Sequence, residues 1–435
     1  MFARRIAVVG TGYVGLTTGA CLASLGHRVV CADIDVAKVE RLRRGVVDIL
    51  EPGLPELVVE GLAAGRLEFV VGAREAVVRP EEELPVEVVF LCVPTPMGAG
   101  GAADLSAVRA VSAEVAQLLP SGCVVVNKST VPVGTAEATA KLLNRRDVAV
   151  VSNPEFLREG SAVRDFLHPD RIVVGCDAQD AAERVAALYA KLGAPVVLTD
   201  AASAEMVKYA ANCFLAMKLS YVNAVAELCD VLGADVGAVT EGMGYDRRIG
   251  QAFLEPGPGW GGSCLPKDTE AMVAVAAAAG RELLIVSASI ATNERQRALM
   301  VAKIRDAVGG SLAGLRIGLL GLTFKAGTDD LRDSPALAVA ALLRGEGAEL
   351  TAFDPGCPVP VAGVTDAVTV VGEPLLVAKD AAALVVLTEW PQFRSLDWAA
   401  MGAAMAIRIV VDTRNLLDPD VLRRAGLSWV GVGRR

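Results

Sequence analysis

The sequence predicts an α/β protein of two Rossmann-like, doubly wound domains joined by a long central helix and a helical region. Short apolar runs alternate with helical patterns near both ends of the chain, and a glycine-rich turn follows the first run. Between the two alternating regions, residues 203–232 contain neither proline nor glycine, which favours one long helix. We therefore divide the chain into an N-terminal domain (residues 1–197), a central helical domain (198–305) and a C-terminal domain (306–435).

Each alternating region supplies strands separated by helical segments. The strands expected in the N-terminal region are residues 6–9, 28–32, 86–93, 123–127, 148–152 and 171–175. Those expected in the C-terminal region are residues 315–320, 349–353, 383–387 and 407–411. The central region adds helices at 203–232, 272–279 and 287–301, with a glycine-rich loop at 256–264 after the first of them. This alternation predicts a mainly parallel sheet in each of the two α/β domains.

The composition excludes several classes of protein. A chain of 435 residues that is 53% hydrophobic and 21% charged is neither disordered nor fibrous. Its formal charge of −9 argues against nucleic acid or an anionic membrane as the main partner. The 9 cysteines lack the paired spacing of a disulfide framework or a metal site, so we expect a cytoplasmic protein without a bound metal. With only His27 and His168 available, acid-base chemistry falls to Lys, Asp and Glu.

A dinucleotide fingerprint opens the N-terminal region. Gly10, Gly12 and Gly15 follow the first apolar run and begin a helix, and Asp33 ends the next expected strand. Gly10 permits the tight turn, Gly12 lets a pyrophosphate approach the backbone, and Gly15 allows close packing of the helix on the strand. A carboxylate at position 33 would accept hydrogen bonds from a ribose and repel a 2′-phosphate, so we expect NAD rather than NADP. The alternative is a glycine-rich structural turn.

A second signal is a cysteine that follows a run of glycines. Pro266 suits the first position of a helix, which places Cys264 at the N-terminus of that helix. The helix dipole and Lys267 would favour the reactive thiolate, whereas the charge of Asp268 would raise the thiol pKa. We interpret the four glycines at 257–262 as clearing space around a reactive thiol. The alternative is a small buried cysteine followed by a helix-stabilising acid.

Other candidate site residues lie in the long helix and at strand ends. Lys208 and Asn212 share one face of the helix, where together they would hold an oxyanion, unless Lys208 simply faces solvent. Thr130 and Glu155 follow expected strands, at the edge where doubly wound sheets bind ligands. Each of these two loops is also consistent with a plain turn and helix cap.

The C-terminal domain carries cations at the ends of its expected strands. Lys325 and Arg332 follow the first strand, and Arg414 follows a later one. These side chains would bind a phosphate without a glycine cradle, which gives an acidic protein a local site for an anion. A solvated loop of salt bridges is the alternative.

In this order, the motifs closely resemble those of the nucleotide-sugar 6-dehydrogenases, the UDP-glucose/GDP-mannose dehydrogenase family. The resemblance covers essentially the whole chain, and Gly261-Gly-Ser-Cys264-x-Pro-Lys-Asp268 is its most specific element. The other matching motifs are Gly10-x-Gly12-x-x-Gly15, Val93-Pro-Thr95-Pro, Ser129-Thr130-Val-Pro, Asn153-Pro-Glu155-Phe, Lys208 with Asn212, and Phe324-Lys325.

The resemblance implies an NAD-dependent, four-electron oxidation of UDP-glucose to UDP-glucuronate by a homodimer or higher oligomer. Cys264 would capture the aldehyde as a thiohemiacetal, whose oxidation gives a thioester that water hydrolyses. The implied catalytic residues are Cys264, Lys208, Asn212, Asp268, Glu155 and Thr130. The implied cofactor-binding residues are Gly10, Gly12, Tyr13, Val14, Gly15, Asp33, Lys38, Thr95, Thr130, Glu159, Lys267 and Arg332. The implied substrate-binding residues are Glu155, Phe156, Leu157, Lys208, Asn212, Arg248 (toward a neighbouring subunit's substrate), Phe253, Leu254, Gly257, Gly261, Phe324, Lys325 and Arg414.

Two positions depart from the family pattern. Glu255 stands where animal-type members often carry lysine, and Trp260 replaces the commoner tyrosine or phenylalanine. The runner-up function is oxidation of GDP-mannose or of another nucleotide sugar, although Ser263 disfavours the UDP-N-acetylmannosamine enzymes, which typically carry histidine there. A non-catalytic nucleotide-sugar sensor is a further alternative, which the presence of Cys264, Lys208 and Asp268 disfavours.

Overall fold

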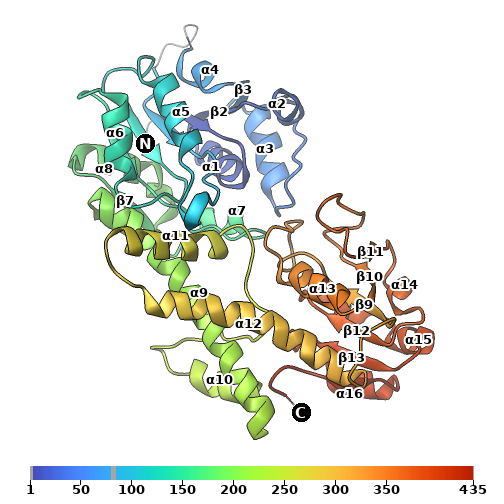
Figure 1. Cartoon of the computed structure of the whole chain (residues 1–435). Coiled ribbons are helices and arrows are strands. Elements are labelled where there is room, and N and C mark those ends of the chain that lie inside the picture. Colours follow the sequence, from blue (N-terminus) through green and yellow to red (C-terminus); the bar gives the residue numbers. More distant parts are fainter. Residues whose placement is uncertain (1–2, 80–84, 435) are drawn as a thin grey trace. The chain divides into compact units, whose positions relative to one another are not determined.

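A computed structural model describes residues 3–79 and 85–434 of the chain (Figure 1). The chain forms two compact units, one of Met1–Ala211 with Glu270–Ala279 and one of Asn212–Thr269 with Gly280–Arg435. Each unit contains one largely or wholly parallel sheet. Helices α9 (Ala201–Leu232) and α11 (Leu265–Ala278) each contribute residues to both units.

The sheet of the first unit has the order β3-β2-β1-β4-β5-β6-β7-β8. Its strands are β1 (Arg5–Val9), β2 (Arg28–Asp33), β3 (Leu67–Val71), β4 (Val88–Leu91), β5 (Val124–Asn127), β6 (Ala149–Ser152), β7 (Ile172–Gly175) and β8 (Val196–Thr199). The first six have the Rossmann order, 3-2-1-4-5-6, and are parallel. β7 joins antiparallel to β6, and β8 then runs parallel to β7.

Helices cover both faces of this sheet, so its central strands are almost entirely buried and mostly apolar. Ile6 and Val8 of β1 face a core that includes residues of α1, α3, α7 and α8, whereas Ala7 and Val9 face a core with α4, α5 and α6. The helices of this unit are α1 (Tyr13–Ser24), α2 (Val36–Arg43), α3 (Leu54–Ala63), α4 (Ala73–Val77), α5 (Ser106–Val115), α6 (Thr135–Leu143), α7 (Ala162–Leu167) and α8 (Gln179–Leu188).

The sheet of the second unit has the order β11-β10-β9-β12-β13-β14, again the Rossmann order, with every pair parallel. Its strands are β9 (Arg316–Leu320), β10 (Glu349–Phe353), β11 (Thr369–Val370), β12 (Ala383–Val386), β13 (Ile409–Asp412) and β14 (Ser428–Val430). The helices within this part of the chain are α13 (Pro335–Gly345), α14 (Pro374–Ala378), α15 (Trp398–Ala404) and α16 (Pro419–Arg424).

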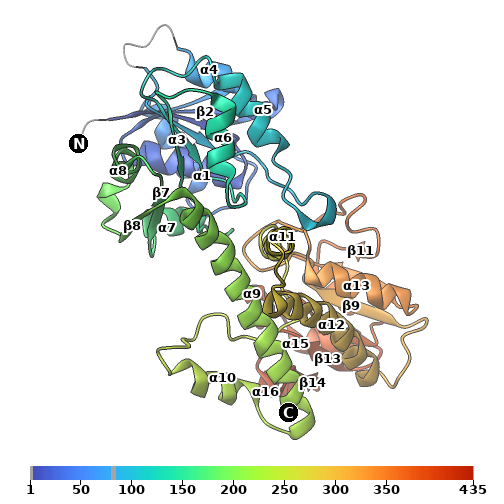
Figure 2. The same cartoon turned by 60° about the vertical axis from the view of Figure 1, so that its left-hand side comes forward.

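The helical region lies between the two alternating segments of the chain. α9 is one unbroken helix of 32 residues (Figure 2). α10 (Val236–Gly244), α11 and α12 (Leu284–Ala307) follow it, and residues of α9 and α12 join the apolar core of the second sheet. Among the described residues, no helix is both long and apolar enough to cross a membrane.

The predicted fold class is confirmed, because the structure contains two doubly wound sheets, the long helix α9 and the two further predicted helices, α11 and α12; α10 was not predicted. Four strands were not predicted: β3 and β8 in the first sheet, and β11 and β14 in the second. Each of them is the outermost strand of its sheet. Edge strands are shorter or more exposed than central ones, as the two residues of β11 and the exposed β8 illustrate, so they lack the continuous apolar run that marks a buried strand.

Candidate functional site

The turn between β1 and α1 has the geometry of a dinucleotide site. Gly10 has φ +97°, and a Cβ there would lie 2.6 Å from the carbonyl oxygen of Cys92. A Cβ on Gly15 would lie 1.8 Å from the carbonyl oxygen of Gly10, so the start of α1 packs directly on the turn. A Cβ on Gly12, by contrast, would meet no protein atom within 4 Å. Protein packing therefore explains two of the glycines, whereas Gly12 borders open space at a helix N-terminus, where a pyrophosphate fits.

Asp33, at the end of β2, is held in place by the same turn. Its Oδ2 accepts hydrogen bonds from the Thr11 backbone N–H (3.0 Å) and hydroxyl (2.6 Å), and Lys38 Nζ lies 3.4 Å away. Burial alone would raise the pKa of Asp33, but the hydrogen bonds from Thr11 and Asp35 outweigh it and lower the pKa to about 2. The carboxylate is therefore ionised and fixed, as recognition of a ribose requires.

Tyr13, in the glycine-rich turn, reaches toward a buried acid. Its hydroxyl donates to Glu51 (3.2 Å), which also accepts from the backbone N–H of Gly160 (2.7 Å). Burial, with the charges of Glu51 and Glu159, raises the pKa of Tyr13 far above its usual range. Glu51 thus ties the turn to the loop after β6 that carries Glu159.

A buried ion pair forms at the strand ends of the first unit. Lys208 Nζ of α9 lies 2.9 Å from Glu155 Oε1, and both side chains are 5% exposed. Glu155 Oε2 also accepts from the Leu157 N–H (2.7 Å). Burial opposes ionisation of Glu155, but Lys208 and this backbone bond outweigh it and lower the pKa of the carboxyl. Lys208 therefore does not simply face solvent.

Two further contacts involve the loops that follow β4, β5 and β6. The Thr95 hydroxyl donates to the Thr130 carbonyl (2.9 Å), which joins the loops that follow β4 and β5, and both residues are buried. Phe156 lies under the guanidinium of Arg171, with 3.5 Å from the guanidinium carbon to the ring centroid, and Lys208 Nζ lies 5.5 Å from the same centroid.

The second unit holds the candidate nucleophile. Cys264 directly precedes α11, and its carbonyl accepts the hydrogen bond from the N–H of Asp268 (3.0 Å). α11 begins at Leu265, so Pro266 is its second residue rather than its first. The Cys264 side chain is partly exposed, with the Ser263 hydroxyl 3.6 Å from its sulfur.

Asp268 is the centre of a polar cluster beside this thiol. The carboxylate is 1% exposed, accepts from Asn212 Nδ2 at 2.6 Å, and lies 2.5 Å from Lys267 Nζ. Lys267 thus pairs with the acid that follows it, and the two opposite charges lie together in the first turn of α11. Burial and the charge of Asp268 raise the pKa of the nearby Cys213 to about 12, which keeps that thiol protonated.

The glycines at 257–262 have a different role from the predicted one. A Cβ on Gly261 would lie 1.9 Å from the Asp333 carbonyl oxygen, and one on Gly262 would lie 2.7 Å from the Phe324 ring. Side chains at Gly257 and Gly259 would meet Arg414 at 3.0 Å and Asn293 at 2.7 Å. The interpretation that these glycines clear space around Cys264 is therefore wrong, because they let the loop pack tightly against its neighbours.

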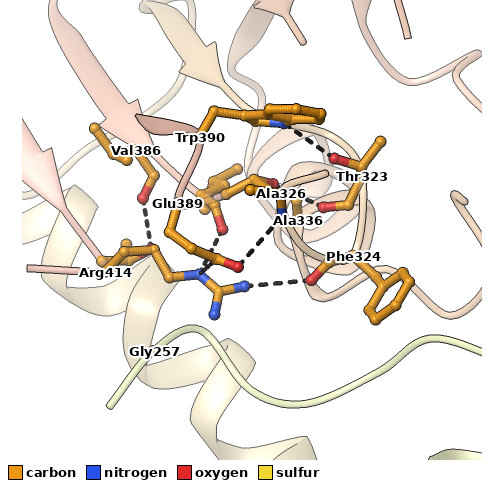
Figure 3. Close-up of polar contacts among 12 residues, drawn as sticks. Gly257, Thr323, Phe324, Ala326, Ala336, Val386, Glu389, Trp390 and Arg414 are labelled. Atoms are coloured by element: carbon orange, nitrogen blue, oxygen red, sulfur yellow. Dashed lines mark hydrogen bonds and ion pairs between the residues drawn. The ribbon is translucent and has the colours of Figure 1, made fainter. Parts of the chain in front are cut away.

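Arg414 lies near Gly257 of this loop and contacts the segment that follows β9 (Figure 3). Its Nε donates to the Leu387 carbonyl (2.9 Å) and lies 3.2 Å from Glu389 Oε2, while Nη2 lies 3.5 Å from the Phe324 carbonyl. Glu389 Oε1 also accepts from the Ala326 N–H (3.3 Å). The guanidinium is thus held between two segments of the second unit, the one after β12 and the one after β9.

The turn after β9 contains an aspartate–threonine contact like that of Asp33 with Thr11 in the first unit, although it lacks the three-glycine motif. Asp354, after β10, accepts from the Thr323 N–H (2.8 Å) and hydroxyl (2.9 Å), as Asp33 accepts from Thr11. Gly321 has φ +105° and approaches Thr388, as Gly10 approaches Cys92. Asp354 is 0% exposed, so it stabilises the turn and cannot reach a ribose.

The predicted site residues are divided between the two units. The first contains Gly10, Gly12, Tyr13, Val14, Gly15, Asp33, Lys38, Thr95, Thr130, Glu155, Phe156, Leu157, Glu159 and Lys208. The second contains Asn212, Arg248, Phe253, Leu254, Gly257, Gly261, Cys264, Lys267, Asp268, Phe324, Lys325, Arg332 and Arg414. Arg248 and Arg332 are exposed and pair with Asp246 (2.6 Å) and Asp330 (2.7 Å).

Three charged residues near these sites were not predicted, of which Lys128 and Glu205 are buried and Glu389 is partly exposed. Lys128 follows β5, Glu205 lies one turn before Lys208, and Glu389 follows β12. Lys128 and Glu389 occupy strand ends, the positional signal that was used for Thr130 and Glu155. Glu205 carries no such signal, because it lies within α9 rather than at a strand end. Its partners, the backbone N–H groups of Gly134 and Ala136, are remote in the sequence.

Family models match nearly all of the chain. Residues 4–193 match the NAD binding domain of the UDP-glucose/GDP-mannose dehydrogenase family, residues 202–295 its central domain and residues 318–419 its UDP binding domain. The chain belongs to the UDP-glucose/GDP-mannose dehydrogenase family.

Individual members of the family match over nearly their full length. The UDP-glucose 6-dehydrogenase of Rhizobium meliloti (strain 1021) is 42% identical over 440 residues, which cover 99% of each chain. TuaD of Bacillus subtilis (strain 168), also a UDP-glucose 6-dehydrogenase, is 40% identical over 99% of this chain and 93% of its own. The solved structure of a UDP-glucose dehydrogenase from Pyrobaculum islandicum superposes with a TM-score of 0.88 at 36% identity, covering 100% of this chain and 98% of that one.

Membership in the UDP-glucose/GDP-mannose dehydrogenase family makes the chain an NAD-dependent oxidoreductase with a UDP-binding domain. The predictions of family, enzyme class and cofactor are thus confirmed. The residues of the first unit fit NAD, because Gly12 leaves open space at the α1 N-terminus and Asp33 presents an ionised carboxylate beside it.

Proposed function

We propose that this dehydrogenase oxidises UDP-glucose to UDP-glucuronate, with Cys264 as the covalent nucleophile. The overall reaction converts the C6 alcohol, two NAD and one water into a carboxylate, two NADH and three protons. NAD held by the fingerprint turn would supply the hydride acceptor for each of the two oxidations. The observation that carries this proposal is the partly exposed Cys264 at the start of α11, beside the buried Asp268–Asn212 pair.

The residues around Cys264 fit covalent capture of an aldehyde. The thiolate adds to the aldehyde carbon to give a thiohemiacetal, whose oxidation leaves a thioester on Cys264. Water then attacks the thioester and releases the acid and the thiol. We assign to Asp268 the positioning of this water and the handling of its proton, because Lys267 and Asn212 hold its carboxylate at 2.5 and 2.6 Å. Covalent capture prevents loss of the aldehyde.

The buried pair in the first unit has groups suited to the reacting oxygen. Lys208 would stabilise the C6 oxyanion, with Asn212 one helical turn along α9, while Glu155 and Thr130 order water and protons. Lys208 would exchange its contact with Glu155 for one shared with the substrate.

We assign the remaining predicted residues to the binding of UDP-glucose or of NAD. For UDP-glucose we assign Arg414, Lys325 and Phe324 to the nucleotide part, and the segment 253–257 with Gly261 to its covering loop. Phe156 and Leu157 line the sugar, and Arg248 serves the neighbouring subunit's substrate. For NAD we assign the fingerprint residues with Lys38, Thr95, Glu159, Lys267 and Arg332. We also propose that the chain has three domains, with boundaries at 197/198 and 305/306.

We further propose a cytoplasmic homodimer or higher homo-oligomer. Phe214, Tyr221 and Leu228 of α9 are each more than half exposed and lie seven residues apart, which makes an apolar stripe along one side of the helix. Such a stripe is typical of a helix that packs against a second copy.

The test is turnover of NAD with a panel of UDP-glucose, GDP-mannose and UDP-N-acetylmannosamine. We expect UDP-glucose to give the highest kcat/KM, with two NADH formed for each UDP-glucuronate and no free aldehyde. A single NADH per sugar with released aldehyde would contradict the covalent mechanism, and preferential turnover of GDP-mannose would contradict the substrate assignment.

A further inference from the structure

Lys128 is a buried cation that has no place in the proposed mechanism. It is the first residue after β5, in the loop that continues to Thr130, and is 5% exposed. Burying an ammonium group is costly unless a carboxylate pairs with it. Among the described residues, however, no carboxylate lies within ion-pair distance of Lys128.

The groups that contact Lys128 are neutral. Its Nζ donates to Asn153 Oδ1 (3.1 Å) and to the Tyr189 hydroxyl (3.4 Å) and lies 5.5 Å from the centroid of the Tyr189 ring. The Tyr189 hydroxyl itself donates to Asn153 Oδ1 (2.6 Å), and Asn153 Nδ2 donates to the Val173 carbonyl (2.7 Å). This network fixes Lys128 in one position and presents only oxygen acceptors to it.

The charges that act on Lys128 belong to the proposed catalytic pair. Glu155 attracts the ammonium and Lys208 repels it, and Cys92 is the other titratable group that acts on it. Burial raises the pKa of Cys92 to about 12 and that of Tyr189 still higher, so both are neutral near pH 7. Two lysines therefore act on one carboxylate inside the protein, and the cluster is cationic when all three groups are ionised.

We infer that Lys128 is a positioning residue whose positive charge holds Glu155 ionised against Lys208. This inference rests on the proposed function, because it gives Lys128 a role through Glu155. If both Lys208 and Lys128 stabilise the carboxylate, Glu155 keeps its negative charge when Lys208 turns to the substrate oxygen. Without Lys128, departure of Lys208 would leave Glu155 buried and unpaired, and it would take up a proton.

The ionisation of Lys128 then affects the pH dependence of the reaction. Burial lowers the pKa of Lys128 to about 8, with the charge of Lys208 acting in the same direction and that of Glu155 opposing the change. Because this pKa lies below the ordinary value, Lys128 is mostly protonated at pH 7 and loses its charge just above pH 8. The support for Glu155 is therefore present at neutral pH and is withdrawn at alkaline pH.

The first test replaces Lys128 by methionine, which keeps the chain length and removes the charge. We expect the acidic limb of the kcat/KM profile for UDP-glucose to move upward by about 0.5–1 pH unit, with KM for NAD unchanged. The matched control is Lys141→Met, because Lys141 is exposed on α6 and pairs with the exposed Glu137. A Lys128→Met profile that superimposes on the wild-type profile would overturn the inference.

A second test does not depend on activity. In protein with 13C-labelled lysine side chains, the resonance missing from Lys128→Met is expected to titrate near pH 8 in the wild-type protein. Glu155→Gln should lower that titration midpoint, because the opposing charge is removed, and Lys141→Met should leave it unchanged. Should Lys128→Met fail to fold, Tyr189→Phe identifies the same resonance by the shift that loss of its hydroxyl causes. A midpoint near 10.5, or one that does not respond to Glu155→Gln, refutes the inference even if the substrate assignment holds.

Discussion

Replacement of Gly12 by alanine would separate cofactor binding from folding. Gly12 is the residue before α1, with φ −65° and ψ −175°, a conformation that alanine adopts without strain. An added Cβ meets no protein atom within 4 Å. Alanine reduces the entropy of the unfolded chain by about 0.4–1 kcal/mol and costs about 0.5 kcal/mol as a poorer N-cap. We therefore expect the free energy of unfolding to change by less than about 1 kcal/mol.

NAD binding should respond much more strongly to the same change. A methyl group at Gly12 would occupy the space where the pyrophosphate approaches the N–H groups at the start of α1. Loss of one hydrogen bond to a charged group costs about 1.5–3 kcal/mol, which corresponds to a Kd for NAD raised about 10- to 150-fold. Calorimetric titration with NAD measures the change in Kd, and urea unfolding of the same samples measures the change in the free energy of unfolding.

Two further variants complete this experiment. Gly242→Ala, in α10, also adds a Cβ that meets nothing within 4 Å and should leave NAD binding unchanged. Gly15→Ala would force a Cβ to 1.8 Å from the Gly10 carbonyl oxygen, so stability and NAD binding should both fall. A Gly12→Ala protein that binds NAD as tightly as the wild type would refute the assignment of this open space to the pyrophosphate.

Four other substitutions test separate parts of the proposal. Asp33→Ser should narrow the preference for NAD over NADP in kcat/KM by at least about tenfold, because the carboxylate no longer repels a 2′-phosphate; an unchanged ratio would contradict this role. Cys264→Ala should abolish UDP-glucuronate formation and the covalent sugar adduct seen by mass spectrometry, and unchanged turnover would exclude covalent catalysis. Glu205→Gln should lower the unfolding free energy in urea by about 1–3 kcal/mol, because the buried carboxylate accepts from two N–H groups at the start of α6 and from Ser152. Tyr221→Glu should dissociate the oligomer in sedimentation, and a wild-type monomer at assay concentration would refute the assembly.

Local patterns in the sequence were sufficient for the fold class and the cofactor turn. Buried parallel strands need continuous apolar runs, and a strand followed by Gly10, Gly12 and Gly15 is typical of a turn that binds a dinucleotide. The long helix was equally evident, because residues 203–232 lack any residue that would interrupt it. The edge strands β3 and β8 were missed because their pairing depends on one neighbour rather than on an apolar run of their own.

The contacts among charged groups could be obtained only from the tertiary structure. The spacing of Lys208 and Asn212 predicts that they share a helix face, but not that one contacts Glu155 and the other Asp268. Asp354 accepts hydrogen bonds from Thr323 after the first strand of the second sheet, as Asp33 accepts them from Thr11 in the first unit. No glycine motif in the sequence predicts this contact. These partners are remote in sequence, and local spacing carries no information about them.

Side-chain burial explains the remaining difference between sequence and structure. A lysine after a strand is usually exposed, and only the packing of Asn153 and Tyr189 around Lys128 shows that this one is not. The glycines at 257–262 were correctly predicted to form a special loop, but the reason for them lay in Phe324, Asp333 and other residues far along the chain. The sequence by itself determined the periodicities and the turn that binds the cofactor, because these depend on neighbouring residues. The tertiary structure decided which charges are buried and paired, because desolvation depends on every segment that covers a group.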